Sequence, residues 1–359
     1  MITHFSRSSC LSLLRSLKST KFSSSQTSSS RRMLSSSVFD RPFKIAQKNA
    51  SSHLLSKSDS DPIDYSYFNT EIATRLIERL EDVRSRDFTL ALDLGSKTGE
   101  VLMAINREES LSGNGGGIGG VRKLVMVEGS KGMRSLVNSE EEFCSSYTVP
   151  DGDEAMLPLP FPDDSFDCVV SSMSLHWISD LPSTLTEINR ILKPDGAILL
   201  AIPGGETLPE LRSSLLLAET ERDGGVSLRC GPYVDVPDVG RLLQGAGFRL
   251  NTVDVDSVAV SYPNMMVLME HLQRMGENNA STARRGTASK DLFLSAAAIY
   301  SSMFPSEFND DSNPSEDEII ATVQVIYGIG WKKHDSQQKP DERGTASAKI
   351  GEDIVIDQG

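Results

Sequence analysis

The sequence has 359 residues, enough for one large domain or two small ones, and its formal net charge is −14. No apolar run in it approaches the roughly 20 residues that a transmembrane helix requires. The four cysteines are far apart and form no C-x-x-C pair, which argues against a zinc site or a disulfide framework and favours a reducing compartment.

Residues 1–39 differ from the rest of the chain in composition. They contain six basic residues, fifteen serines and no acid, a pattern typical of an organelle transit peptide. A secretory signal would need a longer apolar core and a small-residue cleavage site, and neither is evident. The pair Arg31-Arg32 resembles mitochondrial cleavage sites, so we predict import into mitochondria, with the chloroplast as the alternative.

From residue 40 on, the chain has 30 basic and 50 acidic residues. Such a surface repels nucleic acid, whose binding depends on neutralising phosphates with Lys and Arg. It would accept a cationic protein or peptide more readily, although acidity also serves solubility alone. We therefore expect no nucleic-acid partner.

Residues 40–85 are expected to form a helical segment that leads into the main domain. An amphipathic helix is predicted from about Tyr67 to Arg84, with Ile72, Leu76 and Leu80 on one face. A polar linker rich in Ser, Lys and Asp is expected before this helix.

The stretch from Leu90 to Gly99 predicts a buried strand that ends in a ligand-binding turn. Its apolar run reaches Asp93, and Gly95 and Gly99 then frame the turn into a helix that begins near Glu100. Glycines let the backbone turn tightly and bring peptide N–H groups close to a ligand. In nucleotide-binding α/β sheets, ligands bind beyond the carboxyl ends of such strands.

A second apolar strand, Lys123–Val127, also ends in an acid, Glu128. Asp93 and Glu128 are 35 residues apart, more than the roughly 20 expected between a glycine loop and its ribose-binding acid. An eleven-residue flexible insert, Ser110–Gly120, explains the excess. Glu128 could accept hydrogen bonds from both ribose hydroxyls; the alternative is a solvated acid that opens a helix.

Strands and helices alternate from Leu90 to Ile202, which predicts a doubly wound, mostly parallel sheet. The main domain is expected over residues 86–335, with a helical insertion at about 258–320 and a polar tail at 336–359. Further strands are predicted at Ser145–Val149, Phe166–Ser171, Ala197–Ile202, Phe248–Asp256 and Thr322–Trp331. Helices are predicted from Glu128 to about Phe143, at Leu181–Leu192, at Val236–Ala246, at about Met265–Met275 and at Asp291–Met303. Lys193–Gly196 is expected to be a turn.

A dinucleotide is one candidate ligand for the turn after the first strand. It would require G-x-G-x-x-G, but Lys97 occupies the middle glycine position, and the glycines at 115–120 precede a strand. A ligand with ribose and adenine but no phosphate fits the acids better. S-adenosylmethionine is such a ligand, with Gly95 and Gly99 beside its methionine portion, Glu128 on the ribose and Asp153 on the adenine amino group.

The order of motifs resembles class I S-adenosylmethionine-dependent methyltransferases over about residues 90–202. The motifs are D-x-G-x-x-x-G, an acid ending the next strand, D-x-x-x-L-P, F-D-x-V-x-S and L-K-P-D-G. Other blocks resemble the mitochondrial complex I assembly factor 5 family, among them V-F-D-R at 38–41, S-L-H-W at 174–177, G-E-T-L at 205–208, M-G-E-N at 275–278 and I-G-W-K at 329–332.

This resemblance implies a class I methyltransferase (Rossmann-like) α/β fold that binds S-adenosylmethionine. The implied cofactor-binding residues are Asp93, Gly95, Lys97, Gly99, Glu128, Asp153 and Met156. The family is reported to hydroxylate an arginine of a complex I iron–sulfur subunit, in the mitochondrial matrix or at the matrix face of the inner membrane, with at most peripheral membrane association. Lys97 replaces the glycine usual at its position, and its ammonium could pair with the cofactor's carboxylate.

The candidate catalytic residues are His176, Trp177 and Glu206. His176 could be a base or a positioning donor, and Trp177 could cover the sulfonium by a cation–π contact; the alternative is a packed histidine and a loop tryptophan. The acids Glu206, Glu210, Glu219 and Glu221 could bind a guanidinium in a hydrated groove, or be merely solvated. We expect no metal site, because the histidines after residue 39 form no H-x-D pair.

Three functions agree with the sequence. The first is a mitochondrial enzyme that modifies a protein arginine during complex I assembly. The second is a conventional methyltransferase of a small molecule such as a quinone or biotin precursor, and the third is a non-catalytic assembly chaperone.

Overall fold

The computed structural model describes residues 37–56, 65–81, 88–112, 120–137, 145–149, 152–286, 288–306 and 318–337. The predicted transit peptide and polar tail lie almost entirely outside these ranges.

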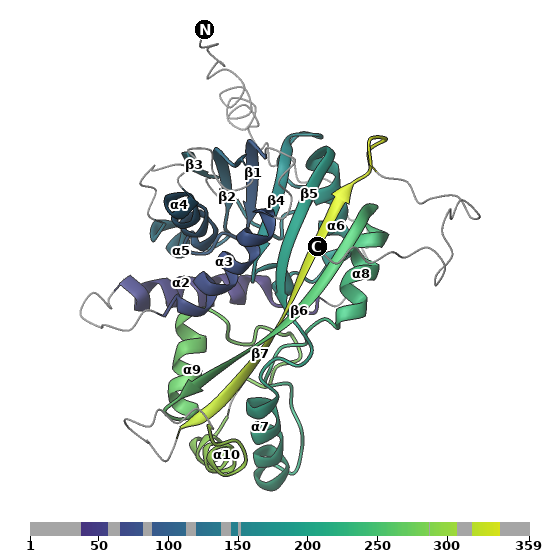
Figure 1. Cartoon of the computed structure of the whole chain (residues 1–359). Coiled ribbons are helices and arrows are strands. Elements are labelled where there is room, and N and C mark those ends of the chain that lie inside the picture. The colour runs from purple at the N-terminus through teal and green to yellow at the C-terminus, as the bar shows by residue number, and fades with distance from the viewer. Residues whose placement is uncertain are drawn as a thin grey trace, which may run out of the picture.

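One seven-stranded sheet, with strand order β3-β2-β1-β4-β5-β7-β6, forms the centre of the fold (Figure 1). Its strands are β1 (Leu90–Leu94), β2 (Lys123–Val127), β3 (Ser145–Thr148), β4 (Phe166–Ser172), β5 (Leu192–Pro203), β6 (Phe248–Tyr262) and β7 (Ile319–Lys332). β1 to β5 pair in parallel, while β7 is antiparallel to both β5 and β6. This confirms the predicted α/β class and mostly parallel sheet.

Helices cover both faces of the sheet. On one face, α3 (Tyr67–Glu81) and α4 (Glu100–Ser112) pack on side chains such as Ala91. On the other face, α6 (Leu181–Ile191) and α8 (Val236–Gly245) pack on Leu92 and Leu94. Successive residues of β1 therefore point into different cores, which explains why its sequence is almost continuously apolar.

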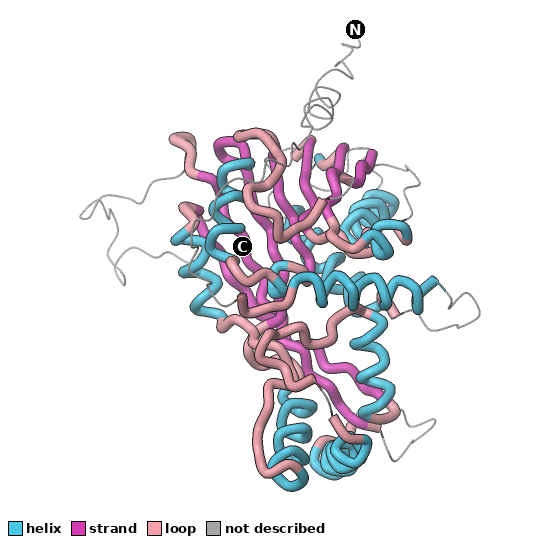
Figure 2. The backbone as a smooth tube through the Cα atoms, turned by 180° about the vertical axis from the view of Figure 1, so that it is seen from behind, coloured by secondary structure: helices cyan, strands magenta, loops and turns pink. Residues whose placement is uncertain are grey.

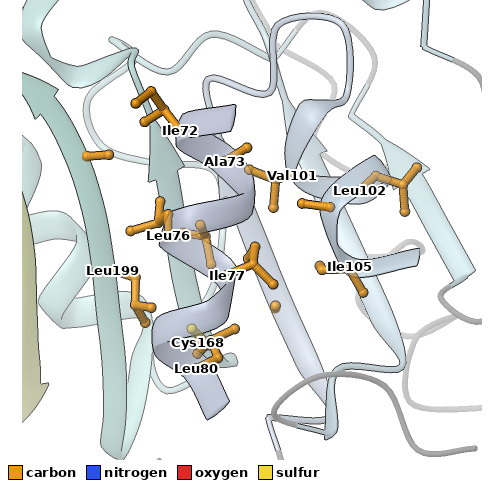
Figure 3. Close-up of a cluster of buried hydrophobic side chains, with 14 of the residues drawn as sticks. Ile72, Ala73, Leu76, Ile77, Leu80, Val101, Leu102, Ile105, Cys168 and Leu199 are labelled. Carbon is orange, nitrogen blue, oxygen red and sulfur yellow. The ribbon is translucent and has the colours of Figure 1, made fainter. Parts of the chain in front are cut away.

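The predicted apolar face of α3 is confirmed. Ile72, Leu76 and Leu80 are fully buried, and Figure 3 shows them between the sheet and the side chains of α4. Burying each such side chain contributes about 1.5–3 kcal/mol, so α3 is an integral layer of the domain.

A separate lobe forms where β6 and β7 extend beyond the other strands (Figure 1). There α7 (Pro209–Arg222), α9 (Met265–Arg274) and α10 (Lys290–Met303) enclose a third apolar cluster. α9 and α10 lie within the predicted helical insertion. The strands on either side are longer than predicted, since β6 continues to Tyr262 and β7 begins at Ile319.

A helical segment was expected over residues 40–85, but no helix was assigned to Arg41–Ser56, where the structure has α2, and the end of α2 takes up part of the expected linker. This helix crosses the molecule between the parallel strands and the lobe of α7, α9 and α10 (Figures 1 and 2). It also packs on the short helix α5 (Lys131–Ser135). The buried residues of α2 are polar or charged, namely Lys44, Lys48, Ser51 and Ser52.

Two other predictions differ from the structure. The turn expected at Lys193–Gly196 belongs to β5, with Asp195 in the left-handed region at a φ of 67°. An irregularity in the pairing with β4, between Phe166 and Cys168, accommodates it. The helix expected from Glu128 to about Phe143 is described only as α5, and residues 138–144 lie outside the described ranges.

Within the described ranges, no helix is both long and apolar enough to span a membrane.

Candidate active site

The turn after β1 has the geometry of a ligand-binding loop. Gly95 adopts a φ of 85°, and a Cβ atom built there would lie 2.0 Å from the Ser174 Oγ. Only glycine fits both constraints. Lys97 is also left-handed, with a φ of 48°, and its backbone N–H donates to the Glu128 carboxylate at 3.1 Å. The turn is thus joined directly to the acid that follows β2.

Glu128 is completely buried, and its carboxylate accepts four bonds from the protein itself. The Lys48 ammonium of α2 lies 3.0 Å from each oxygen, and the N–H groups of Ser130 and Lys97 complete the set. Burial and the neighbouring charge of Glu154 raise the pKa of Glu128 above its usual value, against the pull of Lys48. Helix α2, whose Lys48 lies 80 residues before Glu128 in the chain, therefore supplies the main positive charge that balances Glu128.

Glu154 is an acid of this site that the sequence did not single out. It is fully buried and lies 2.9 Å from Lys48 and 2.8 Å from Arg41, both from α2. Burial alone would raise the pKa of Glu154, but Lys48 and Arg41 hold it well below its usual range. The predicted residue, Asp153, is partly exposed and pairs with Arg41 at 2.5 Å. The only sequence signal for Glu154 is its position next to Asp153.

Asp93, at the end of β1, is the one acid of this group without a partner in the described part of the chain. It is fully buried, and both carboxylate oxygens lack a hydrogen bond there. Burial, with the charges of Glu100 and Glu128, raises the pKa of Asp93 well above its usual value. Because buried polar groups are nearly always satisfied, an orphaned carboxylate at this edge marks a place for a cationic or hydrogen-bond-donating ligand.

A second centre forms around His176 and Trp177, which lie buried in the short 3₁₀ helix η3 (Leu175–Trp177) after β4. Both side chains contact the carboxylate of Glu277, which follows α9. The His176 Nε2 is 3.0 Å and the Trp177 Nε1 is 2.8 Å from the same Glu277 oxygen. The other oxygen of Glu277 accepts from the Lys97 ammonium at 2.7 Å. Sequence reasoning missed Glu277 because it lies far from any strand end.

The contacts of His176 define its protonation state. Burial lowers the pKa of His176 below its usual value despite the nearby Glu277 charge, so the ring is neutral at pH 7. Its Nε2 must then carry the proton, because it faces a carboxylate. The opposite ring nitrogen, Nδ1, is buried and has no partner among the described residues.

The ring of Trp177 is covered by the side chain of Lys44, whose pKa burial lowers well below its usual value. The Lys44 Nζ of α2 lies 3.3 Å from the ring centroid and donates to the carbonyl oxygens of Gly276 and Asn278 at 2.9 and 2.7 Å. Phe39 packs against the ring edge-on at 5.3 Å. Lys44 therefore fixes both Trp177 and the backbone that carries Glu277.

The four acids predicted to bind a guanidinium, which lie in α7 or just before it, differ in burial and in bonding. Glu210 and Glu219 are buried, so the prediction that they lie in a hydrated groove is wrong. Glu210 accepts from the Thr322 backbone and hydroxyl, and Glu219 accepts from Ser227 and from Arg229 at 2.6 Å. Glu206 and Glu221 are exposed. Met156, which follows Asp153 in a turn, is 39% exposed.

A metal ion would need several His, Cys, Asp or Glu side chains close together among the described residues. Among them, no three or more His, Cys, Asp or Glu side chains are grouped so that they could hold one. Cys168 and Cys230 are both free thiols.

Comparison with known proteins identifies the family. The methyltransferase domain family (Methyltransf_11) matches residues 92–200. The human protein "Arginine-hydroxylase NDUFAF5, mitochondrial" is 42% identical over 315 residues, which cover 88% of this chain and 83% of that protein. The chain belongs to the NDUFAF5 family.

One more distant relative and one solved structure are also similar to this chain. A malonyl-[acyl-carrier protein] O-methyltransferase from Halorhodospira halophila is 30% identical, over 76% of this chain and 84% of that protein. The crystal structure of the YcgJ protein from Bacillus subtilis superimposes with a TM-score of 0.46 at 17% identity, over 72% of this chain and 99% of that one. Members of the NDUFAF5 family such as the human protein carry mitochondrial names, in agreement with the predicted localisation.

Proposed function

We propose that this protein is a mitochondrial, S-adenosylmethionine-binding enzyme that hydroxylates an arginine of an iron–sulfur subunit of respiratory complex I during its assembly. The observation that carries this proposal is the 42% identity to the human arginine hydroxylase, which extends over 88% of this chain rather than over the methyltransferase motifs alone. The acidic chain, with 50 acidic and 36 basic residues, suits a cationic target.

The acids at the carboxyl edge of the sheet suit S-adenosylmethionine. The ligand's amino group would find the orphaned Asp93 carboxylate, and its ribose hydroxyls would find Glu128. Among the described residues, two cations, Lys48 and Arg41, pair with Glu128, Asp153 and Glu154, while Asp93 pairs with neither, so carboxylates outnumber cations at this edge. When bound, S-adenosylmethionine supplies a sulfonium and an ammonium, both cationic, which such an edge favours.

The chain itself covers the acids of this edge, since Glu128 and Glu154 are completely buried. α2 lies across it and places Lys48 on both Glu128 and Glu154. The ribose hydroxyl groups of the cofactor can bind Glu128 only if they share its oxygens with the Lys48 ammonium or displace that ammonium. We therefore expect α2 to shift when the cofactor binds, and then to close over it.

A second candidate function is the methylation of a small molecule or carrier-bound acid. It is favoured by the similarity to malonyl-[acyl-carrier protein] O-methyltransferase, at 30% identity over 76% of this chain. A third, a non-catalytic assembly chaperone, would need only the fold and its surface.

Mass spectrometry of complex I subunits, from cells with and without this protein, separates the three functions. The proposal predicts an arginine that carries an added oxygen only when the protein is present. An added methyl group on a small molecule or carrier, with the subunits unchanged, would favour the second function. Subunits that are unmodified in both samples, with assembly impaired only in the absence of the protein, would favour the third.

A further inference from the structure

Glu277 lies where two cavities of the molecule meet. A small, mainly apolar cavity of about 50 Å³ is lined by Phe68, Met173, His176, Tyr262 and Glu277, among others. An open groove of about 380 Å³ is lined by Leu211, Phe293, Arg284, Arg285 and again Glu277. The side chain of Glu277 is 14% exposed and lines both the cavity and the groove.

The carboxylate of Glu277 is held in a fixed position from several sides. His176 and Trp177 donate to one oxygen and Lys97 to the other. The backbone on either side of Glu277 is fixed by Lys44. Burial would raise the pKa of Glu277, but Lys97 and His176 keep it well below its usual value. Glu277 is therefore a permanent, pre-positioned anion at the inner end of an open groove.

Lys97 links this anion to the cofactor edge. Its backbone N–H donates to Glu128, while its ammonium binds Glu277 at 2.7 Å and Asn69 at 3.1 Å. The same residue thus contacts the proposed ribose acid with its backbone and the groove anion with its side chain. A change in the hydrogen bonding of Glu128 can therefore affect Glu277 through Lys97 alone.

We infer that Glu277 is the receptor for the guanidinium of the substrate arginine, and that Lys97 occupies this receptor until the cofactor binds. This inference rests on the proposed function. A carboxylate oxygen accepts charge-assisted hydrogen bonds from a guanidinium, and the Glu277 oxygen that Lys97 occupies is the one that the substrate would take. Of the acids first considered for this role, Glu210 and Glu219 are committed to α7 and its neighbours, while Glu206 and Glu221 lie on the surface.

The role of Lys97 follows from its charge. An ammonium at 2.7 Å from Glu277 repels a second cation that approaches the same oxygen. The carboxylate of a bound S-adenosylmethionine offers this ammonium an alternative anion, and its departure leaves one oxygen of Glu277 free. Binding of the arginine should consequently be stronger with the cofactor present, and the cofactor should bind more tightly with the arginine present.

The test is calorimetric titration of the full chain, or its imported form, with an acetyl-Gly-Arg-Gly-amide peptide. Titrations are run with and without S-adenosylmethionine, and the isosteric citrulline peptide is the neutral ligand control. Glu277→Gln should weaken binding of the arginine peptide at least about tenfold. Glu221→Gln, which removes a charge from an exposed site, is the matched control and should bind as the wild type does.

Lys97→Met provides an independent variant that leaves Glu277 intact. It should bind the arginine peptide equally well with and without the cofactor, whereas the wild type should bind it more tightly with the cofactor. Wild-type binding that is insensitive to the cofactor would overturn the role of Lys97. Equal affinity of wild type and Glu277→Gln for the arginine peptide, or equal affinity of the wild type for both peptides, would overturn the role of Glu277.

The same samples separate this inference from the proposed function. Mass spectrometry of the complex I subunit after incubation with the wild type reports hydroxylation directly. If oxygen is added to arginine but Glu277→Gln binds the peptide normally, the inference fails while the proposed function stands. If the peptide binds through Glu277 but the subunit gains no oxygen, the proposed function fails instead.

Discussion

Two groups of buried carboxylates in this protein are neutralised in different ways. Glu128 and Glu154, at the carboxyl edge of the sheet, receive their main counter-charge from Lys48 and Arg41, on a helix far away in sequence. Glu210 and Glu219, in α7, accept from hydroxyl and backbone groups of packed neighbours, and Glu219 also pairs with the nearby Arg229. We interpret the first group as a ligand site that α2 covers, and the second as scaffold, because only the first includes an orphaned acid, Asp93.

The largest expected effect on stability is at Glu154. Glu154→Ala removes the shared partner of Lys48 and Arg41 and leaves both cations short of an anion in a buried site. Removing one partner of a buried ion pair costs about 3–5 kcal/mol, so the free energy of unfolding in urea should fall by that amount. Glu221→Ala, on the surface of α7, should stay within about 0.5 kcal/mol of wild type. A small effect at Glu154 would show that α2 does not hold this edge.

Cofactor affinity should depend on Glu128. Glu128→Ala removes the acceptor proposed for two ribose hydroxyls, and charge-assisted bonds of this kind contribute about 2–4 kcal/mol together. Calorimetric titration with S-adenosylmethionine measures the loss. An unchanged affinity in a folded variant would exclude Glu128 from the cofactor site.

A scaffold acid should behave in the opposite way. Glu219→Gln weakens the bonds to Ser227 and Arg229 that tie the loop after α7 to the helix. We expect a loss of about 1–2 kcal/mol in the free energy of unfolding and no change in affinity for S-adenosylmethionine. If cofactor binding falls with stability, the division between the two groups is wrong.

The smallest expected effect is a dependence of stability on pH. Burial lowers the pKa of His176 below the ordinary histidine value of about 6.5. As the pH falls below 6.5, the unfolded chain therefore takes up a proton that the folded chain does not bind, and stability decreases until the folded pKa is reached. The slope is at most about 1.4 kcal/mol per pH unit. Urea titrations between pH 7 and 5 should show a shallower slope for His176→Asn, and identical slopes would contradict the assignment.

The sequence predicts strand β1 of the carboxyl edge but not the helix α2 that covers it. Strand Leu90–Leu94 and its acid were predictable because burial on both faces leaves an apolar run. α2 was not, because its buried residues are Lys44, Lys48, Ser51 and Ser52. These show no apolar period, and only the i,i+4 spacing of the two lysines, which places both on one face, could have indicated a cationic helix.

Glu277 was missed for a related reason. It precedes Asn278–Ser289, a stretch whose polar composition is typical of a loose loop. In the structure, Ala280 and Ser281 of that stretch are buried, and Ser281 pairs with Phe39 in an antiparallel bridge. Contacts between segments so distant in sequence depend on the tertiary fold, and local composition does not reveal them.

Asp93→Asn tests the central claim, that the carboxyl edge is kept for a ligand, most directly. The substitution preserves the size of a side chain that has no partner in the described structure and removes its capacity to bind an ammonium group as an anion. Calorimetry with S-adenosylmethionine, paired with urea unfolding at pH 7, should show binding at least about tenfold weaker in a protein that is no less stable than the wild type. Unchanged affinity for S-adenosylmethionine, or a fold that collapses when this carboxylate is removed, would contradict the account.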